Sequence, residues 1–285
     1  MHFRFASRWT AILIATAVTL LAVGAYLSLP RSYILMATTT STRDTGLLPY
    51  LLPRFTADTG IDVRYIAVGT GQALDAGRRG DADVVMVHAP SLEARFLADG
   101  DGLCRNEVMY NRFVVVGPAA DPADVRDAQS AAGAFQRIHN ASARFESRAD
   151  TSGTHNKELQ LWAAAGLDTS AFGAWYEKTE QGMGATLTIA NERDAYTLSD
   201  DGTWYALEGN LPYLRILYRS GEPVEPVLRN QYSVIPVNPA AHSAVLAEEA
   251  VAFARWLVSP RGQSLIGAFT VNGHAIFTPN GAGAC

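Results

Sequence analysis

The sequence predicts an α/β fold of two lobes, each with a mostly parallel sheet flanked by helices, and a ligand cleft between the lobes. From residue 31 onward, short apolar runs alternate with helical stretches, an order typical of parallel sheets covered on both faces. Two strand-like segments, 113–116 and 234–237, enclose the middle of the chain. A lobe inserted between two such crossings forms a clamshell, in which ligands bind at the carboxyl ends of strands.

The first lobe is predicted to begin with three strands separated by helices. The strands are the apolar run 33–37, the alternating β-branched segment 61–68 and the segment 83–88, whose composition is that of a buried parallel strand. Helices are expected at 46–58, from about residue 72, and at 91–98. Pro53 lies inside the first helix and is expected to kink or interrupt it.

The second lobe is predicted to follow the strand at 113–116. Its expected elements are a helix at 123–135, a strand at 143–147, a helix from about residue 154 to 165 and an apolar helix ending near residue 191. Asp200 and Asp201 are interpreted as a solvated tight turn, because carboxylates would repel an anion. The chain then returns through 234–237 to two helices, 243–258 and 260–268. These crossings assign residues 31–115 with 235–285 to lobe I and residues 116–234 to lobe II.

Residues 1–30 are predicted to be a signal peptide or an N-terminal membrane anchor. Arg4 and Arg8 precede an apolar run of about twenty residues, long enough to span a bilayer. Ala22 and Gly24 satisfy the small-residue rule for cleavage, so removal of residues 1–24 and retention as an anchor are both open. Either outcome exports the folded body and predicts a periplasmic location.

The charge of the chain argues against nucleic-acid binding. The net charge is −5, and the body without Arg4 and Arg8 carries −7. An acidic body lacks the clustered basic residues on which nucleic-acid binding depends. Any anion site must therefore be built locally.

The chain has two cysteines, Cys104 and Cys285. In an oxidising compartment they are able to pair, but spacing alone does not establish the geometry of a disulfide. A disulfide and two unpaired thiols are therefore equal alternatives.

Two stretches far apart in the chain look like halves of one anion-binding site. The first is TTTS, residues 38–41, after the first strand; the second is SRADTSGTH, residues 147–155, between a strand and a helix. Where a strand gives way to a helix, unpaired N–H groups and the positive end of the helix dipole favour an oxyanion. Arg148 adds a guanidinium that binds two oxygens, with an ion pair to Asp150 or Glu158 as its alternative role. Taken alone, such loops are usually turns or helix caps.

Two glycine-containing loops are further candidates, and no catalytic motif accompanies them. Gly69-Thr70-Gly71 follows the second strand but lacks the third glycine of a dinucleotide fingerprint, and residues 181–186 precede a helix. We find no nucleophile–base–orienter set, and His155 lacks a second histidine at the spacing of a zinc site. The sequence therefore predicts a binding protein that is not an enzyme and has no cofactor or metal cation.

The body of the chain, from about residue 34 to 279, resembles the periplasmic tungstate-binding proteins of ABC transporters, within the type II periplasmic-binding-protein superfamily. The resemblance is carried by ATTTSTRDTGLL, VGTGQAL, GDADVVMVHAP, FESRADTSGTH, QGMGATLTIANERDAYTLSDDGTW and NQYSVIPVNP. Two positions depart from the family pattern. Ala149 stands where a glycine is expected after the arginine, which would stiffen the loop, and Asp200-Asp201-Gly202 replaces a turn that usually carries a basic residue.

The resemblance implies a ligand, a partner and a set of binding residues. Tungstate, with molybdate as a second ligand, would be captured as the lobes close about the strands near 113–116 and 234–237. The loaded monomer would then deliver it to a membrane permease with its ATPase. The implied oxyanion-binding residues are Thr38, Thr39, Thr40, Ser41 and Thr70 from one lobe and Arg148, Ser152, Gly153 and Thr154 from the other.

Three alternatives remain open at this point. The same donors suit a phosphate- or sulfate-type oxyanion-binding protein, because an SGT loop with an arginine also binds those anions. An uncleaved anchor would make the chain a membrane-anchored anion sensor. A phosphate-ester hydrolase would use the same anion cradle, but it would need a metal cluster or a base beside a nucleophile.

Overall fold

The structure is a computed structural model that describes residues 33–150, 152–283 and 285, so the predicted N-terminal segment lies outside the described residues. Residues 34–285 form one compact unit. In the described part of the chain, no helix combines the length and apolar character needed to cross a bilayer.

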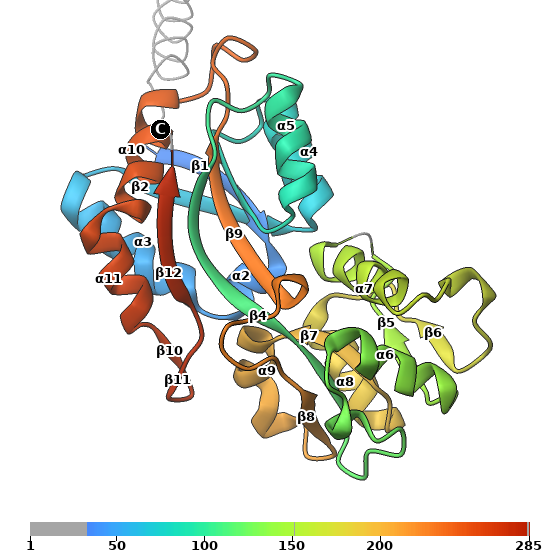
Figure 1. Ribbon diagram of the computed structural model, residues 1–285. Coiled ribbons are helices and arrows are strands. Elements are labelled where there is room, and N and C mark those ends of the chain that lie inside the picture. Colours follow the sequence, from blue (N-terminus) through green and yellow to red (C-terminus); the bar gives the residue numbers. More distant parts are fainter. Residues whose placement is uncertain (1–32, 151, 284) are drawn as a thin grey trace, which may run out of the picture. The chain divides into compact units, whose positions relative to one another are not determined.

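A mixed sheet forms the centre of this unit (Figure 1). Its strands, in the order in which they pair, are β12 (Thr278–Gly283), β4 (Asn106–Pro118), β9 (Arg229–Pro236), β3 (Val84–Val87), β1 (Tyr33–Thr39) and β2 (Asp62–Val68). The far half of β4 pairs with β7 (Thr197–Asp200) and β8 (Leu214–Tyr218). Two small sheets pair β5 (Phe145–Ser147) with β6 (Tyr176–Lys178) and β10 (Thr270–Val271) with β11 (His274–Ala275).

The helices of the described residues connect these strands. They are α2 (Thr40–Asp44), α3 (Leu47–Thr59), α4 (Thr70–Arg78), α5 (Pro90–Ala98), α6 (Ala131–Asn140), α7 (Gly153–Ala164), α8 (Met183–Arg193), α9 (Asp201–Leu207), α10 (Ala247–Val258) and α11 (Pro260–Ala268). Short 3₁₀ turns lie at Val125–Asp127, Thr169–Ala171, Glu208–Asn210 and Pro226–Leu228.

The α/β class is confirmed, but the expectation of a mostly parallel sheet is wrong. β1 and β3 are parallel, whereas β9 is antiparallel to both β3 and β4, and β7, β8 and β12 are antiparallel to β4. The physical reason is the path of the chain. β4 carries the chain away from the first strands and β9 brings it back beside β4, so the two must run in opposite directions.

α3 is not interrupted at Pro53, and α6 differs from its prediction. α3 continues through Pro53 because its apolar face, with Leu51 and Phe55 buried against the sheet, outweighs the hydrogen bond that proline removes. The helix predicted at 123–135 is instead a 3₁₀ turn followed by α6. Ser130 caps α6, accepting a hydrogen bond from the Gly133 N–H at 3.1 Å, and this cap moves the start of the helix toward the C-terminus.

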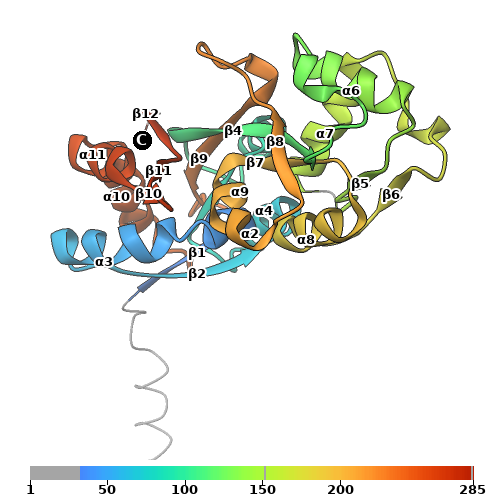
Figure 2. The same ribbon diagram turned by 90° about the horizontal axis from the view of Figure 1, so that it is seen from below.

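The buried apolar side chains of the described residues form four clusters, and we call the two largest the first and second cores. The first core packs α3, α10 and α11 on the sheet, with Phe55 and Phe253 in edge contact at 4.9 Å between ring centroids. The second core lies around α6 and α7, where Phe135 and Trp162 are 4.4 Å apart. Figure 2 shows these helices at opposite ends of β4. β4 contributes to both cores.

The structure pairs Cys104 with Cys285, which resolves the alternatives left open by the sequence. Their Cα atoms are 5.6 Å apart, and the bond closes a loop with a sequence separation of 181 residues. Arg255 Nε also donates to the Cys285 carbonyl at 2.6 Å. The end of the chain is therefore fixed beside β4.

Glu158 is buried in α7 and gives a testable dependence of stability on pH. Burial raises its pKa from 4.5 to about 7, against hydrogen bonds from Tyr176, Ser147 and Trp162. Since the folded state binds this proton more tightly than the unfolded state, its contribution is fully present below pH 4.5 and is lost as the pH rises through 7.

We therefore expect Glu158→Gln to lessen the decline in the free energy of unfolding between pH 5 and 8, by up to about 3 kcal/mol. Urea unfolding at several pH values measures this decline. Glu192→Gln, at an exposed position of α8, is the control. Parallel pH profiles for the parent and Glu158→Gln would contradict the expectation.

Candidate oxyanion site

The first predicted loop lies where β1 passes into α2. Thr39 caps α2, accepting a hydrogen bond from the Thr42 N–H at 3.4 Å, and its hydroxyl is 3.1 Å from that of Ser41. Thr40 is the half-buried first residue of α2. Thr38 instead donates its hydroxyl to the Met86 carbonyl at 2.8 Å, so this side chain ties β1 to β3.

His88 connects this loop to β9, and the sequence analysis did not identify it. Its Nε2 is 3.1 Å from Ser41 Oγ, and its Nδ1 is 2.8 Å from Asn230 Oδ1. Asn230 Nδ2 donates to Asn111 Oδ1 at 2.7 Å, so Oδ1 of Asn230 accepts from the His88 Nδ1–H. Nε2 is then the acceptor for the Ser41 hydroxyl. His88 directly follows β3. Because β3 is parallel to β1, the carboxyl ends of both strands lie at the same edge of the sheet, and this pairing could have indicated that His88 lies near the Thr39 loop.

His88 is held in its neutral form. Burial, with a smaller effect from the charge of Arg148, lowers its pKa to about 4, against the charge of Asp200 and the bond to Asn230. The ring also stacks on Tyr232 at 4.8 Å between centroids. His88 therefore positions Ser41 without adding positive charge at neutral pH.

Thr70 is the first residue of α4, which begins two residues earlier than predicted. It is 1% exposed, and its Oγ1 has no hydrogen-bond partner among the described residues. Thr70 comes shortly after β2. Because β2 neighbours β1 and contacts α2, the end of β2 lies beside the Thr39 loop. A buried hydroxyl without a partner is costly, which suggests that a ligand completes it.

Arg148 lies between β5 and α7 and is 5% exposed. Its Nε donates to the Gln181 carbonyl at 3.3 Å, and its Nη2 forms a short ion pair with Asp150. The ion pair proposed as an alternative thus exists, but in a buried setting. Ala149 has a φ of +47°, a left-handed conformation that favours glycine, so the departure noted in the sequence is a strained position beside Arg148.

The N-terminus of α7 forms the rest of the second loop. Ser152 caps the helix, its hydroxyl accepting from the His155 N–H at 3.2 Å. Thr154 is 1% exposed, and its Oγ1, like that of Thr70, has no partner among the described residues. A Cβ on Gly153 would lie 3.1 Å from the His88 ring, closer than most Cβ contacts, so glycine favours this close approach of α7.

The structure thus connects the two predicted loops through His88. Ser41 of the first loop is hydrogen-bonded to His88, and Gly153 of the second loop packs against the same ring. Thr39, Ser41, Thr70, Arg148, Ser152 and Thr154 are each at most 5% exposed. Their role as ligands stays a prediction, for which these contacts are the geometric basis.

The interpretation of Asp200 and Asp201 as a solvated turn is wrong, because both are 1% exposed. Asp200 caps α9 and accepts from the Thr203 N–H and hydroxyl at 2.9 and 2.7 Å. Burial and the charge of Asp200 raise the pKa of Asp201 to about 7. Asp200 also accepts from Asn111 Nδ2 at 3.2 Å, and Asp201 accepts from the Arg112 N–H at 3.3 Å, so hydrogen bonds replace the water that these carboxyls lose.

Ser41, His88 and Asn230 have the connectivity of a nucleophile, base and orienter, a set that the sequence analysis did not find. A base with a pKa of about 4 is too weak to take a serine proton at neutral pH, and Asn230 adds no charge to assist it. Among the described residues no cluster of His, Cys, Asp or Glu is arranged to hold a metal ion. The arrangement is suited to holding an anion.

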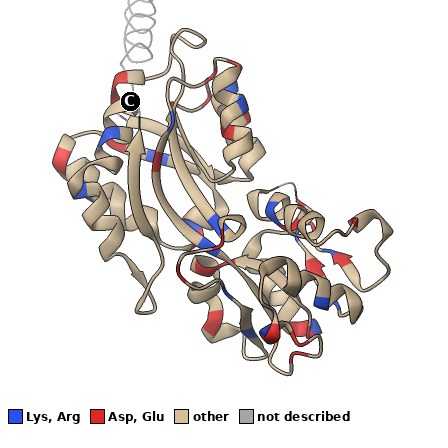
Figure 3. Ribbon diagram, viewed as in Figure 1, with Lys and Arg blue, Asp and Glu red and all other residues tan. Residues whose placement is uncertain are grey.

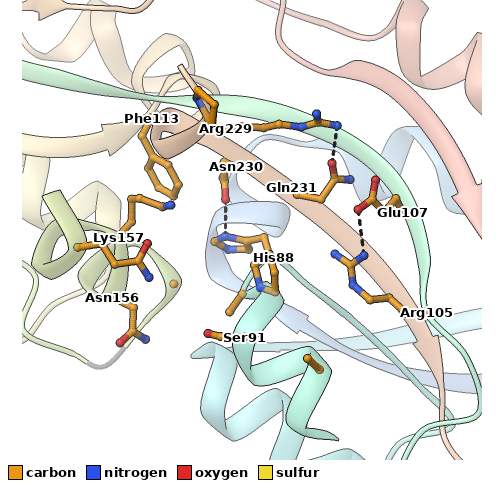
Figure 4. Close-up of a pocket in the computed structure, with 16 residues that line it drawn as sticks. His88, Ser91, Arg105, Glu107, Phe113, Asn156, Lys157, Arg229, Asn230 and Gln231 are labelled. Atoms are coloured by element: carbon orange, nitrogen blue, oxygen red, sulfur yellow. Dashed lines mark hydrogen bonds and ion pairs between the residues drawn. The ribbon is translucent and has the colours of Figure 1, made fainter. Parts of the chain in front are cut away.

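A cavity of about 650 Å³ adjoins the site (Figure 4). His88, Gly153 and Asn230 form part of its wall, and Figure 4 shows Lys157 and Phe113 on one side and Arg229 and Gln231 on another. The cavity therefore adjoins the site at His88 and at Gly153 of the second loop.

Comparison with known proteins identifies the family. The model of the PBP superfamily domain matches residues 24–261. The tungstate-binding protein TupA of Peptoclostridium acidaminophilum is 46% identical over 253 residues, which cover 87% of this chain and 86% of that protein. The solved structure of TupA from Desulfovibrio alaskensis G20 is 45% identical, with a TM-score of 0.78 over 88% of this chain and all of that chain. The solved structure of the tungstate ABC transporter from Geobacter sulfurreducens, also 45% identical, has a TM-score of 0.77 over 85% of this chain and all of that chain. The chain therefore belongs to the PBP superfamily and, within it, to the family of the tungstate-binding proteins TupA.

Proposed function

We propose that this chain is a solute-binding protein that captures tungstate for an ABC transporter, with molybdate as a weaker or comparable ligand. The observation that carries the proposal is a pair of buried hydroxyls, on Thr70 and Thr154, to which the described residues offer no hydrogen-bond partner. One lies at the start of α4 and the other in the first turn of α7. Two hydroxyls left without acceptors in a site already rich in N–H donors match an anion that only accepts hydrogen bonds.

The chemistry of the ligand fits these donors. Tungstate is fully deprotonated near neutral pH, so each of its oxygens is an acceptor. A partly protonated phosphate would also need an acceptor for its own proton. Removing a dianion from water is expensive, so the site needs several charge-assisted hydrogen bonds together with Arg148.

We propose further that the two cores are the cores of two lobes, divided near residues 115 and 235. Closure would be a hinge motion about the strand segments 113–116 and 234–237, and it would enclose the anion between the TTTS and SRADTSGTH loops. The shared contacts of His88 with Ser41 and Gly153 support this arrangement.

The partner we propose is a membrane permease powered by a cytoplasmic ATPase, with this chain acting as an exported, periplasmic monomer. The relatives named for tungstate binding and for a tungstate ABC transporter support this. A phosphate- or sulfate-type binder remains the alternative, since the α7 N-terminus and Arg148 also suit those anions.

Calorimetric titration with tungstate, molybdate, sulfate, phosphate and chromate tests the proposal. We expect tungstate and molybdate to bind more tightly than the other three anions. Tighter binding of phosphate or sulfate would assign the chain to the alternative class.

Removing one of these two hydroxyls is expected to weaken tungstate binding without lowering the stability of the ligand-free protein. Thr154→Val keeps the shape of the side chain and removes a hydroxyl that has no partner in the described part of the chain. Without ligand, the free energy of unfolding should therefore stay equal or rise, because no hydrogen bond is lost. Tungstate affinity should fall roughly tenfold to 150-fold, since a charge-assisted bond contributes about 1.5–3 kcal/mol.

Titration calorimetry and urea unfolding measure the two effects of Thr154→Val, and Thr70→Val is expected to behave alike. Thr188→Val, at an exposed position where the hydroxyl bonds the Gly184 carbonyl, is the matched control. Unchanged tungstate affinity in both test variants would remove the main support for the site.

A further inference from the structure

The cavity beside the site contains a lysine for which the described residues supply no counter-ion. Lys157 is on α7, and no hydrogen bond or ion pair to it occurs within residues 33–150, 152–283 and 285. Its Nζ is 5.9 Å from the centre of the Phe113 ring. Figure 4 shows the side chain directed toward Asn230 and His88. Burial lowers the pKa of Lys157, because the charged form is costly where water is excluded, and an anion in the cavity would offset that cost.

The other cations of the cavity wall are already occupied or exposed. Arg105 is held by Glu93 at 2.7 Å and Glu107 at 3.0 Å. Arg229 is exposed, lies over the Tyr110 ring at 4.2 Å and donates to Gln231. Lys157 is therefore the half-buried cation whose charge the described residues leave uncompensated.

The oxyanion site between the TTTS and SRADTSGTH loops, which we call the inner site, needs a further positive charge. The positive charge of Arg148 is offset by Asp150, and His88 is neutral. A dianion would thus enter a site with little net positive charge. Lys157 is three and four residues after Thr154 and Gly153, so it lies on the same face of α7 as these predicted ligands.

The rest of the molecule does not supply this charge. The body carries a net charge of −7 once Arg4 and Arg8 are left out. Figure 3 shows acidic and basic residues interspersed along the ribbon. Attraction of a dianion therefore depends on charge close to the cleft, where a partly buried cation acts through a low dielectric.

We propose that the cavity is an outer binding subsite for tetrahedral oxyanion dianions, in which Lys157 is the binding cation. The dianion first binds beside Lys157 and Asn156 and then passes Asn230, His88 and Gly153 to the inner site. Asn230 and Gly153 face both places, since they line the cavity and contact His88. This inference rests on the proposed function and adds a kinetic step to it.

Stopped-flow tryptophan fluorescence with tungstate tests the subsite. In the parent, the observed rate constant should level off as tungstate concentration rises, because the outer subsite fills first. Lys157→Gln should lower the association rate constant about tenfold at low ionic strength and flatten its dependence on salt. Lys157→Arg retains the charge and should stay within about threefold of the parent by the same reasoning.

Lys178→Gln is the matched control, because it removes the same charge from an exposed position on β6 outside the cavity wall. Circular dichroism confirms that each variant is folded. If Lys157→Gln associates as fast as Lys178→Gln while calorimetry shows that both bind tungstate, the subsite is wrong and the proposed function stands. If the parent gives no heat with tungstate, the proposed function fails and the subsite with it.

Discussion

Replacing Arg148 by alanine is expected to weaken tungstate binding by more than about 150-fold, beyond the loss of a single charge-assisted bond. The guanidinium is 5% exposed and already holds Asp150. Alanine would leave the Asp150 carboxylate facing the dianion without the cation between them. Breaking a buried pair by removing one partner leaves an uncompensated charge, which makes this the most damaging change at the site.

Titration calorimetry measures the loss caused by Arg148→Ala, and Arg148→Lys separates charge from geometry. Lysine keeps the positive charge but cannot bind two oxygens with a planar fork, so an intermediate affinity is expected. Arg126→Ala is the control, since Arg126 is exposed and bonds the Ala119 carbonyl outside the cavity wall. Binding of tungstate by Arg148→Ala within threefold of the parent would refute the assignment.

Removing the disulfide between Cys104 and Cys285 is expected to lower the free energy of unfolding by up to about 5 kcal/mol in the chain-entropy model. The loop it closes spans a sequence separation of 181 residues, so the bond restricts much of the unfolded chain. Urea unfolding of the Cys104→Ser, Cys285→Ser double variant, beside the oxidised parent, measures the loss.

A reduced parent is the matched control for the disulfide, because it retains both thiols and lacks only the bond. It should unfold at nearly the same urea concentration as the double variant. Equal stability of the oxidised parent and the double variant would show that the bond constrains little.

The position of most elements could be predicted from the sequence, because apolar periodicity reports burial directly. The direction of the strands could not. Residues 113–116 read as one short strand, yet β4 extends over Asn106–Pro118 and pairs with different strands along its two halves. Pairing partners are decided by contacts between residues far apart in the chain, which local patterns do not contain.

The candidate site was predictable in part, for a related reason. Hydroxyls and glycines at strand ends marked Thr70, Gly153 and Thr154, since such residues start helices. His88 was not marked, because its function depends on Ser41 and Asn230, which lie 47 and 142 residues away. Asp200 and Asp201 were misread because the sequence does not show that the fold buries both carboxyls.

The shared membership of β4 in both cores has a consequence for how the protein unfolds. Val108 packs in the first core and Val115 in the second, on one continuous strand. Neither core can lose its sheet without breaking the hydrogen-bond ladder that the other core uses. The two cores should therefore melt together as one cooperative transition, although the chain visits the second core only between two passages through the first.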